Sequence, residues 1–354
     1  MSEWNQTGES IRGRGTASNP AGRFTRLEVE PDPENSDGIS PKTRFYQDDA
    51  ASVIATNDSP DVPFEASLNP YRGCEHGCVY CYARPFHEYL DMSPGLDFET
   101  RIMVKKDAAA KLRKQLQSPA WKPRTVSVSG VTDPYQPVER KLGITRRCLE
   151  VLSEFRNPFT IITKNHLVTR DIDLIGGMAE LGAARVMVSL TSLDPGLVSI
   201  MEPRTSRPAR RLETIRELSR AGITVGAMFG PLIPALTDEE LPRLVEQAAE
   251  AGASFGSYIM LRLPGAVGPL FEDWLEKHYP QRKQKIISRL KALRGGALSD
   301  HRFGYRMKGE GAFAEQIRQS FQISCRRYGL KDSGPPLTNR HFRRVPTQGE
   351  LELY

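Results

Sequence analysis

The sequence has no long, uninterrupted apolar stretch. None of its 354 residues belongs to a run approaching the roughly 18 apolar residues that a membrane-spanning helix requires. The first thirty residues also lack the apolar core of a secretory signal. From these absences we predict a cytoplasmic protein with no membrane segment.

Nucleotide-binding loops and internal repeats are missing as well. There is no G-x-G-x-x-G fingerprint and no Walker loop, which weakens any interpretation as a nucleotide-hydrolysing protein. No self-similarity occurs at the periods typical of solenoids or propellers. The length and the 39% hydrophobic content instead suit one large domain with extensions, or two small domains.

Cysteine is scarce and unevenly distributed. Three of the five cysteines, Cys74, Cys78 and Cys81, lie within eight residues, with three and then two residues between them. An odd number of clustered thiols in a chain without a secretory signal argues against disulfides. Gly73 and Gly77 allow the loop to turn all three sulfurs inward, because glycine adopts positive φ at little cost. The loop therefore predicts a metal centre.

Two kinds of metal centre fit this loop. One is a zinc site with His76 or His87 as the fourth ligand, in a non-enzymatic nucleic-acid-binding protein. The other is an iron–sulfur cluster, for which thiolates are the usual ligands. An iron–sulfur site could serve electron transfer alone or an enzyme.

The spacing of the cysteines, with Tyr80 directly before the last one, resembles the signature of radical S-adenosylmethionine (SAM) enzymes. In that family three cysteines bind three irons of a 4Fe-4S cluster, and the fourth iron binds the amino and carboxylate groups of SAM. The absence of a fourth nearby cysteine agrees with this resemblance, which covers roughly residues 62–265. It implies a reductive cleavage of SAM to a 5′-deoxyadenosyl radical, with an electron donor such as a flavodoxin or ferredoxin as partner.

From Glu65 onward, short apolar runs alternate with longer amphipathic segments. Strands are predicted at 66–71, 125–130, 159–164, 185–191, 223–230 and 254–261, and helices at 107–116, 140–155, 169–181, 208–221 and 237–251, the last opening with a Thr237–Glu240 capping box. This alternation predicts an α/β protein with parallel βαβ units. A partial barrel and an open doubly wound sheet both satisfy it. The resemblance implies a partial (β/α)6 barrel, with the cysteine loop after the first strand.

Polar side chains follow several of these strands, and in either architecture they meet at the same edge of the sheet. Lys164 suits a carboxylate, Asp133 suits an ammonium, and Ser129 and Ser189 suit neutral hydrogen bonds. Together they could hold a zwitterion. His166 also follows a strand, where a hydrogen-bonded structural role is the commoner one. The sequence shows no sharp candidate for a catalytic acid or base.

Three motifs narrow the resemblance to the spore photoproduct lyase-like branch: Asn-Pro-Tyr-x-Gly-Cys at 69–74, Ser-x-x-Thr-Asp-Pro-Tyr-Gln-Pro-x-Glu at 129–139, and Thr-Lys at 163–164. The resemblance implies that Tyr80 and Tyr82 flank SAM and that Ser129, Lys164 and Ser189 contact it.

One departure from that branch matters for the substrate. Spore photoproduct lyase has a hydrogen-donating cysteine near the second strand, where this chain has Val126–Ser129. Repair of a thymine dimer therefore does not transfer. Cys148 and Cys325 fall in predicted helices, where lone cysteines are usually small buried hydrophobes.

The predicted organisation is a flexible basic arm at 1–60, a core domain at 61–265 and a helical basic extension at 266–354. The arm is polar and carries Arg12, Arg14, Arg23 and Arg26. In the extension, an amphipathic helix at 282–294 is expected to cover an open edge or end of the sheet. A segment at 303–312 mixes Arg, Phe and Tyr, side chains that stack on bases. With the net charge of +6, these features are compatible with nucleic acid as a partner, whereas a solvated surface is the commoner meaning of such residues.

Overall fold

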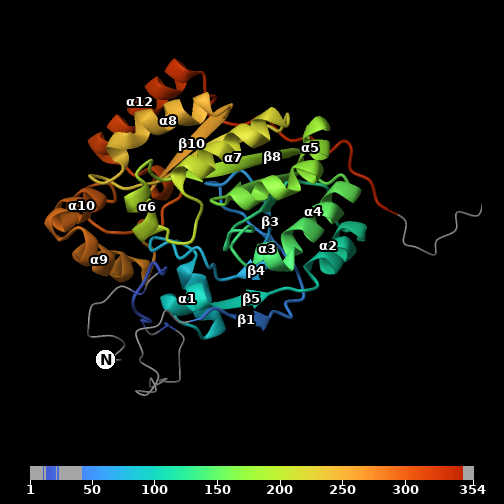
Figure 1. Ribbon diagram of the computed structural model, residues 1–354, viewed down its shortest axis with the longest axis horizontal. Helices are drawn as coiled ribbons and strands as arrows, with labels where there is room; N and C mark the ends of the chain where they lie inside the picture. The colour runs from blue at the N-terminus through green and yellow to red at the C-terminus, as the bar shows by residue number, and fades with distance from the viewer. Residues whose placement is uncertain (1–10, 12, 21, 24–41, 346–354) are drawn as a thin grey trace, which may run out of the picture.

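The computed structural model describes residues 11, 13–20, 22–23 and 42–345 (Figure 1). Its main sheet has seven strands in the order β10-β9-β8-β7-β6-β3-β2. Six of them are mutually parallel: β3 (Ala66–Leu68), β6 (Val126–Val128), β7 (Phe159–Thr163), β8 (Ala184–Leu190), β9 (Val225–Leu232) and β10 (Phe255–Met260). The edge strand β2 (Ile54–Thr56) is antiparallel to β3. Within the described residues no pairing joins β10 to β2, so the sheet is a partial barrel and the predicted fold class is confirmed.

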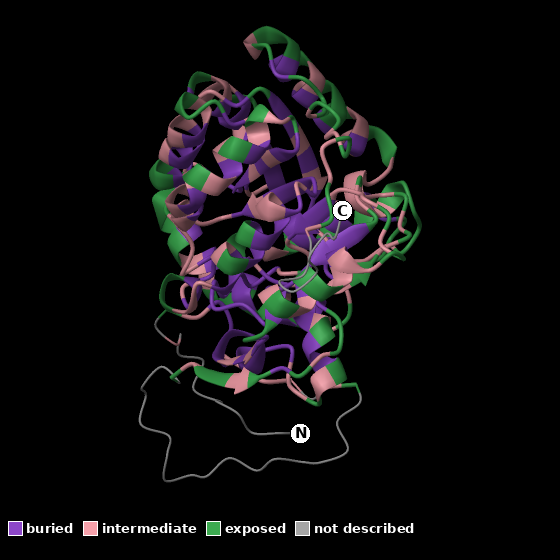
Figure 2. Cartoon of the chain, turned by 90° about the vertical axis from the view of Figure 1, so that its right-hand side faces the viewer, coloured by how far each residue is buried: buried purple, intermediate pink, exposed green. Residues whose placement is uncertain are grey.

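Side chains alternate between the two faces of the sheet along each strand, and the helices cover the face that carries the apolar side chains. In β8, Val186, Val188 and Leu190 belong to the main hydrophobic core, whereas Met187 and Ser189 point to the other face. The core-forming helices are α2 (Ala108–Gln117), α4 (Ile144–Glu154), α5 (Ile172–Glu180), α7 (Pro208–Arg220) and α8 (Leu241–Glu250). Figure 2 shows the strands buried beneath helices whose outer sides are exposed.

The opposite face of the sheet, inside the partial barrel, is polar. Ser67, Ser127 and Thr160 occupy neighbouring positions in the registers of β3, β6 and β7, and all three are buried. The Ser127 hydroxyl has no hydrogen-bond partner among the described residues. At these three strands the inner face of the sheet is therefore polar, unlike the face that the helices cover.

A second, small sheet carries the chain to the cysteine loop. It consists of β1 (Arg44–Gln47), β5 (Arg101–Val104) and β4 (Tyr71–Arg72), in the order β1-β5-β4. The single predicted strand at 66–71 is thus two strands, because the chain leaves the main sheet at Asn69-Pro70. Figure 1 shows the small sheet and α1 (Leu96–Thr100) on the side of the molecule away from α12.

Two predicted helix starts differ from the structure. The predicted helix 140–155 is divided into α3 (Glu139–Leu142) and α4, because Gly143 has φ +63°. The prediction of a capping box before α8 is wrong. The Thr237 hydroxyl accepts the Ile233 amide, and the Glu240 carboxylate binds Ser192 and Leu193, so tertiary partners outcompete the local cap.

The flexible-arm prediction for residues 1–60 is wrong for the described stretches of that region. Residues 44–47 and 54–56 are strands, and Val53 belongs to the main core. Arg14 donates to the Glu99 carbonyl and Arg23 pairs with Glu88, so these polar residues find partners inside the protein. Arg12 and Arg26 lie outside the described residues.

The C-terminal extension packs against the core. Helices α9 (Val267–His278) and α10 (Pro280–Ala292) form a second apolar cluster with Val79 and Leu261, beyond the carboxyl end of β10. The predicted basic helix at 282–294 therefore covers an end of the sheet, not its edge. Helix α12 (Gly311–Tyr328) places Phe321 in the main core beside Tyr258.

The segment after α12 runs along the amino ends of the strands. The Pro335 carbonyl accepts Arg185, Thr338 donates to the Gly182 carbonyl, and the Arg343 amide donates to the Phe155 carbonyl. Each of these partners lies at or next to the start of β7 or β8, so this segment covers one end of the partial barrel.

Candidate functional site

The three clustered cysteines lie on the loop between β4 and the 3-10 helix η2 (Arg84–Leu90). Cys74 and Cys78 are buried and Cys81 is partly exposed. The loop is anchored by the Cys74 amide, which donates to the Phe98 carbonyl at 2.9 Å. Gly73 and Gly77 have φ of +78° and +67°, so the loop needs the left-handed conformations that these glycines were expected to supply.

The surroundings of the thiols disfavour free thiolates. Burial raises the pKa of Cys78 and of Cys81, and the neighbouring Cys74 raises both further. The three thiols influence one another electrostatically, but among the described residues they are not placed to hold a single metal ion. A positively charged metal centre reverses this balance, because it stabilises thiolates directly. The donor set therefore fits a thiolate-bound iron–sulfur cluster.

The zinc alternative requires a histidine ligand, and both nearby histidines are engaged elsewhere. His76 Nδ1 lies 3.4 Å from Asp133 Oδ2; burial alone would lower the pKa of His76, but Asp133 and Cys74 raise it to about 10. His87 Nε2 lies 3.1 Å from the Arg101 carbonyl oxygen, and burial lowers its pKa to about 4. In the described part of the chain, no three His, Cys, Asp or Glu side chains are placed to hold a single metal ion.

Lys164 lies beside the cysteine loop at the end of β7. Its Nζ is 5.9 Å from the centroid of the Tyr80 ring. Burial lowers the pKa of Lys164, while Cys78 and Cys81 act in the opposite direction, so the ammonium is near both thiols. Among the residues that the structure describes, the ammonium makes no hydrogen bond or ion pair, which leaves it available to an anionic ligand group.

Asp133 is already used by the protein. Its Oδ1 accepts the Thr163 hydroxyl at 2.7 Å, and its Oδ2 accepts the Lys164 amide at 2.8 Å. His76 faces the same carboxylate, and the pKa of Asp133 is lowered because these contacts outweigh its burial. This arrangement points to a role in positioning Lys164 rather than in binding an ammonium directly.

The remaining predicted residues lie on the cysteine loop and at or near the ends of strands. The Tyr80 hydroxyl binds the Glu202 carboxylate, and the Tyr82 hydroxyl binds the Gly130 carbonyl next to Ser129. Ser129 Oγ is 3.4 Å from the Thr132 carbonyl oxygen. Ser189 is buried on the inner side of β8. His166 binds the Thr214 hydroxyl and Ser206, in agreement with a structural role.

Two buried ion pairs that hold the cysteine loop were missed by sequence reasoning. Glu202 accepts Tyr80 and Thr191 at one oxygen and Arg211 at the other. Glu75 pairs with Arg204 at 3.0 Å. No spacing links these partners along the chain, because more than a hundred residues separate the loop from them.

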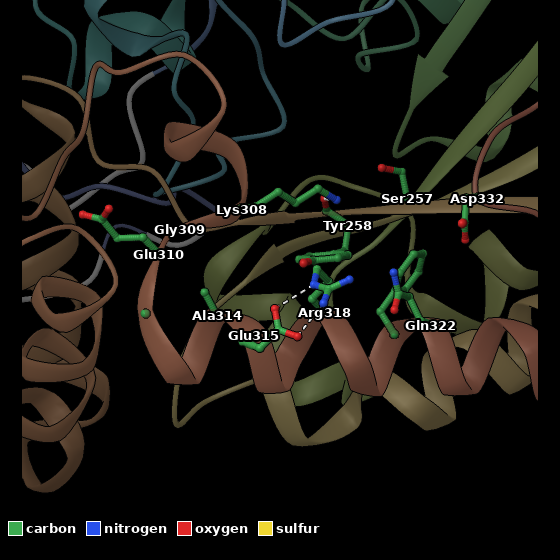
Figure 3. A pocket seen from close by; sticks show the side chains of 12 residues that line it. Ser257, Tyr258, Lys308, Gly309, Glu310, Ala314, Glu315, Arg318, Gln322 and Asp332 are labelled. Carbon is green, nitrogen blue, oxygen red and sulfur yellow. Dashed lines mark hydrogen bonds and ion pairs between the residues drawn. The ribbon is translucent and has the colours of Figure 1, made fainter.

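A cavity of about 340 Å³ lies elsewhere, between β10 and α12 (Figure 3). The Lys308 ammonium stands 3.5 Å from the centroid of the Tyr258 ring there, and burial lowers the pKa of Lys308 to about 8. Figure 3 shows Glu315 and Arg318 paired across its floor. None of the predicted site residues lines this cavity. Cys325 on α12 and Cys148 on α4 are both buried in the main core, as expected for structural cysteines.

Within the part of the chain that the structure describes, no helix is both long enough and apolar enough to span a bilayer.

The chain is similar to a known family and to several other proteins. The model of the radical SAM superfamily matches residues 68–248. An uncharacterized protein of Mycobacterium bovis is 39% identical over 295 residues, which are 82% of each chain. An uncharacterized protein of Methanocaldococcus jannaschii is 26% identical over 228 residues, covering 64% of this chain and 81% of that protein.

Solved structures show the same fold. A spore photoproduct lyase mutant with bound AdoMet and dinucleoside spore photoproduct matches with a TM-score of 0.56 and 18% identity, over 81% of this chain and 80% of that one. A second mutant of that lyase matches with a TM-score of 0.57 and 18% identity, over the same shares. With a family model covering more than half of its length and a close relative along most of it, the chain belongs to the radical SAM superfamily and is a radical SAM enzyme.

Proposed function

We propose that Cys74, Cys78 and Cys81 bind a 4Fe-4S cluster and that SAM binds beside it, at the carboxyl ends of the strands. The observation that carries this proposal is the position of the three clustered thiols, two of them buried, on a loop beside the Lys164 ammonium, which has no hydrogen-bond or ion-pair partner among the described residues. When both cofactors are bound, they supply a one-electron reductive cleavage of SAM and a 5′-deoxyadenosyl radical that takes a hydrogen atom from the substrate. A reduced flavodoxin or ferredoxin is the proposed electron source.

The chain's own residues orient the two cofactors and exclude water. Lys164 binds the carboxylate of SAM, because its ammonium lacks a protein partner among the described residues. Asp133 holds the Lys164 backbone, and Ser129 and Ser189 offer hydroxyls at neighbouring strand ends. Tyr80 and Tyr82 place their rings on either side of the last cysteine, where SAM would be flanked.

A nucleic-acid substrate is supported by exposed aromatic rings on two segments, 82–89 and 303–305. Five rings are each at least 48% exposed: Tyr82, Phe86, Tyr89, Phe303 and Tyr305. Arginines stand over three of them, at 5.9 Å for Arg262 over Tyr82, 4.5 Å for Arg306 over Phe303 and 4.8 Å for Arg302 over Tyr305. Exposed rings stack on unpaired bases, and Arg262, which forms no ion pair among the described residues, is left to bind a phosphate, whereas Arg302 and Arg306 already pair with Asp300 and Asp61.

The cofactor proposal is tested anaerobically. The protein is reconstituted with iron and sulfide, reduced with dithionite, and SAM is followed by chromatography beside a Cys78→Ala control. We expect 5′-deoxyadenosine from the unmodified protein alone. An intact cluster that never cleaves SAM, with or without candidate oligonucleotides, would contradict the proposal.

The substrate proposal is tested by fluorescence anisotropy with labelled single-stranded DNA and RNA. Replacing Phe303 and Tyr305 together by Ala should weaken binding by about tenfold or more, since each stacked base contributes about 1–3 kcal/mol. Ile323→Ala is the matched control, because Ile323 is a 58% exposed apolar side chain on α12. Equal affinities of both variants, or no binding at low salt, would remove nucleic acid as the substrate.

A further inference from the structure

Residues 13–20 lie directly against the cysteine loop. A Cβ atom added to Gly15 would stand 1.6 Å from the Gly77 carbonyl oxygen and 3.1 Å from the Val79 amide. Gly77 in turn has φ +67°, and a Cβ there would stand 2.8 Å from Glu99 Oε2. Two glycine backbones therefore meet face to face, and no side chain fits between them.

Glu99 joins this segment to the loop. Its side chain is completely buried. Oε2 accepts the Gly15 amide at 3.1 Å, while Oε1 accepts the Thr16 hydroxyl at 3.2 Å and the Arg84 guanidinium at 2.5 Å. A buried carboxylate of this kind is stable only with all of these donors in place, so losing the segment would leave it under-satisfied.

Arg84 carries the same connection into the cysteine loop. It is also fully buried, and all five of its N–H groups have acceptors. Two of them hold the Cys78 carbonyl, from Nε at 3.0 Å and Nη2 at 2.9 Å. The others reach the carbonyls of Pro94 and Gly95 and the Glu99 carboxylate. A continuous chain of charge-assisted hydrogen bonds thus runs from Gly15 to the backbone of Cys78.

The other end of the segment is fastened independently. The Leu96 amide donates to the Ser18 carbonyl at 3.2 Å. Asn19 and Asp97 exchange two hydrogen bonds, at 3.0 and 2.9 Å. Both ends of the segment are therefore fixed to α1 and the residues just before it, with Gly15 pressed on the loop.

We infer that residues 13–20 form the outer wall of the cluster site and that Glu99 is the positioning residue that ties this wall to the cysteine loop. The inference rests on the proposed function, because the wall matters only if the loop holds an oxygen-sensitive cluster. Its physical effect is to keep water and oxygen from the outer side of the thiolates and to restrain the loop that carries them.

The test is Gly15→Ala in the full chain, with Gly177→Ala as the matched control. Gly177 lies on α5, where an added Cβ would meet nothing within 4 Å. After anaerobic reconstitution, we expect exposure to air to bleach the cluster absorbance about tenfold faster in Gly15→Ala, because the wall loses at least one hydrogen bond to a charged group. The control should decay at the unmodified rate.

Two further measurements keep the test decisive. Thr16→Val removes only one donor to Glu99, so it should fold normally and bleach about threefold faster. In the cluster-free protein, deuterium exchange at the amides of residues 74–81 should accelerate in both variants. Unchanged bleaching and exchange in a protein whose unmodified form cleaves SAM would overturn the inference and leave the proposed function intact. Failure of the unmodified protein to take up a cluster would instead count against the proposed function.

Discussion

At the scale of single residues, the site depends on how each charge is paired. Both carboxylate oxygens of Asp133 accept hydrogen bonds from protein donors. The Lys164 ammonium, in contrast, has no hydrogen-bond or ion-pair partner among the described residues. The two residues were predicted from the sequence as ligands of one zwitterion, but Asp133 is occupied by the Lys164 amide and Thr163, and only the Lys164 side chain is proposed to bind SAM. The difference arises from hydrogen-bond geometry that no local pattern contains.

Replacing Lys164 by Ala should weaken SAM binding by about tenfold or more and leave the cluster in place. The reason is the loss of a charge-assisted hydrogen bond to the SAM carboxylate, worth about 1.5–3 kcal/mol. Isothermal titration of the reconstituted protein with SAM measures the change, and iron analysis checks the cluster. Lys141→Ala, at an exposed lysine on α3, is the control. Unchanged affinity in Lys164→Ala would remove this residue from the SAM site.

His87 makes the region behind the cysteine loop sensitive to acid. The ring is buried and neutral, with a pKa lowered to about 4 by burial, whereas it titrates near 6.5 when unfolded. Between these values the unfolded chain binds more protons, so stability is complete above pH 6.5 and falls as the pH drops toward 4.

We expect His87 to account for a loss of about 2 kcal/mol in unfolding free energy between pH 7 and pH 5. Urea titrations of the cluster-free protein at both pH values, with His87→Gln beside the unmodified chain, isolate this contribution. The glutamine keeps an N–H donor for the Arg101 carbonyl but does not titrate. The same pH dependence in both proteins would show that other groups cause it.

At the scale of elements, the C-terminal helix α12 shows how a predicted extension becomes part of the core. Phe321 packs edge-on against Phe229 at a centroid distance of 6.1 Å and lies 5.0 Å from the Tyr258 ring. These partners belong to β9 and β10. The apolar stripe of α12 is visible in the sequence, but the surface that it covers is not.

Phe321→Ala should lower the free energy of unfolding by about 3–4 kcal/mol, because it leaves a cavity between α12 and the sheet. Ile323→Ala on the exposed side of the same helix should change it by less than about 0.5 kcal/mol. Calorimetry of Phe321→Ala should show a single cooperative unfolding transition at a lower temperature than that of the unmodified protein. A separate early transition in Phe321→Ala would mean that residues 266–354 fold as an independent unit.

At the scale of the whole molecule, the net charge of +6 does not show how many arginines are free to bind an external anion. Many arginines are committed to internal pairs, such as Arg84 with Glu99 and Arg306 with Asp61. Arg262, at the end of β10, forms no ion pair within the described residues and stands over the half-exposed Tyr82 ring. Burial and the nearby Arg306 lower the pKa of Arg262, whereas Tyr82 and Asp61 act in the opposite direction.

If nucleic acid binds there, its affinity should fall with salt as counterions are released. Arg262→Gln should reduce the slope of log K against log salt by about 0.7, the contribution of one single-stranded phosphate contact. Anisotropy titrations over a range of salt concentrations measure the slope, with Lys141→Gln as the control. An unaltered slope would place the phosphate contacts away from this end of the protein.

The sequence by itself determined the cysteine loop, its glycines, the parallel α/β core and the family, because short-range spacing and the alternation of apolar residues encode each of them locally. Only the tertiary structure decided that the N-terminal polar segment forms a wall beside the loop, that Glu99, Glu202 and their arginines hold it, and that Asp133 is already occupied. Some of these contacts join residues that are more than a hundred positions apart in the sequence. They pair charges that folding buries, because a buried charge without a partner is costly, and a linear pattern does not reveal which residues will be paired.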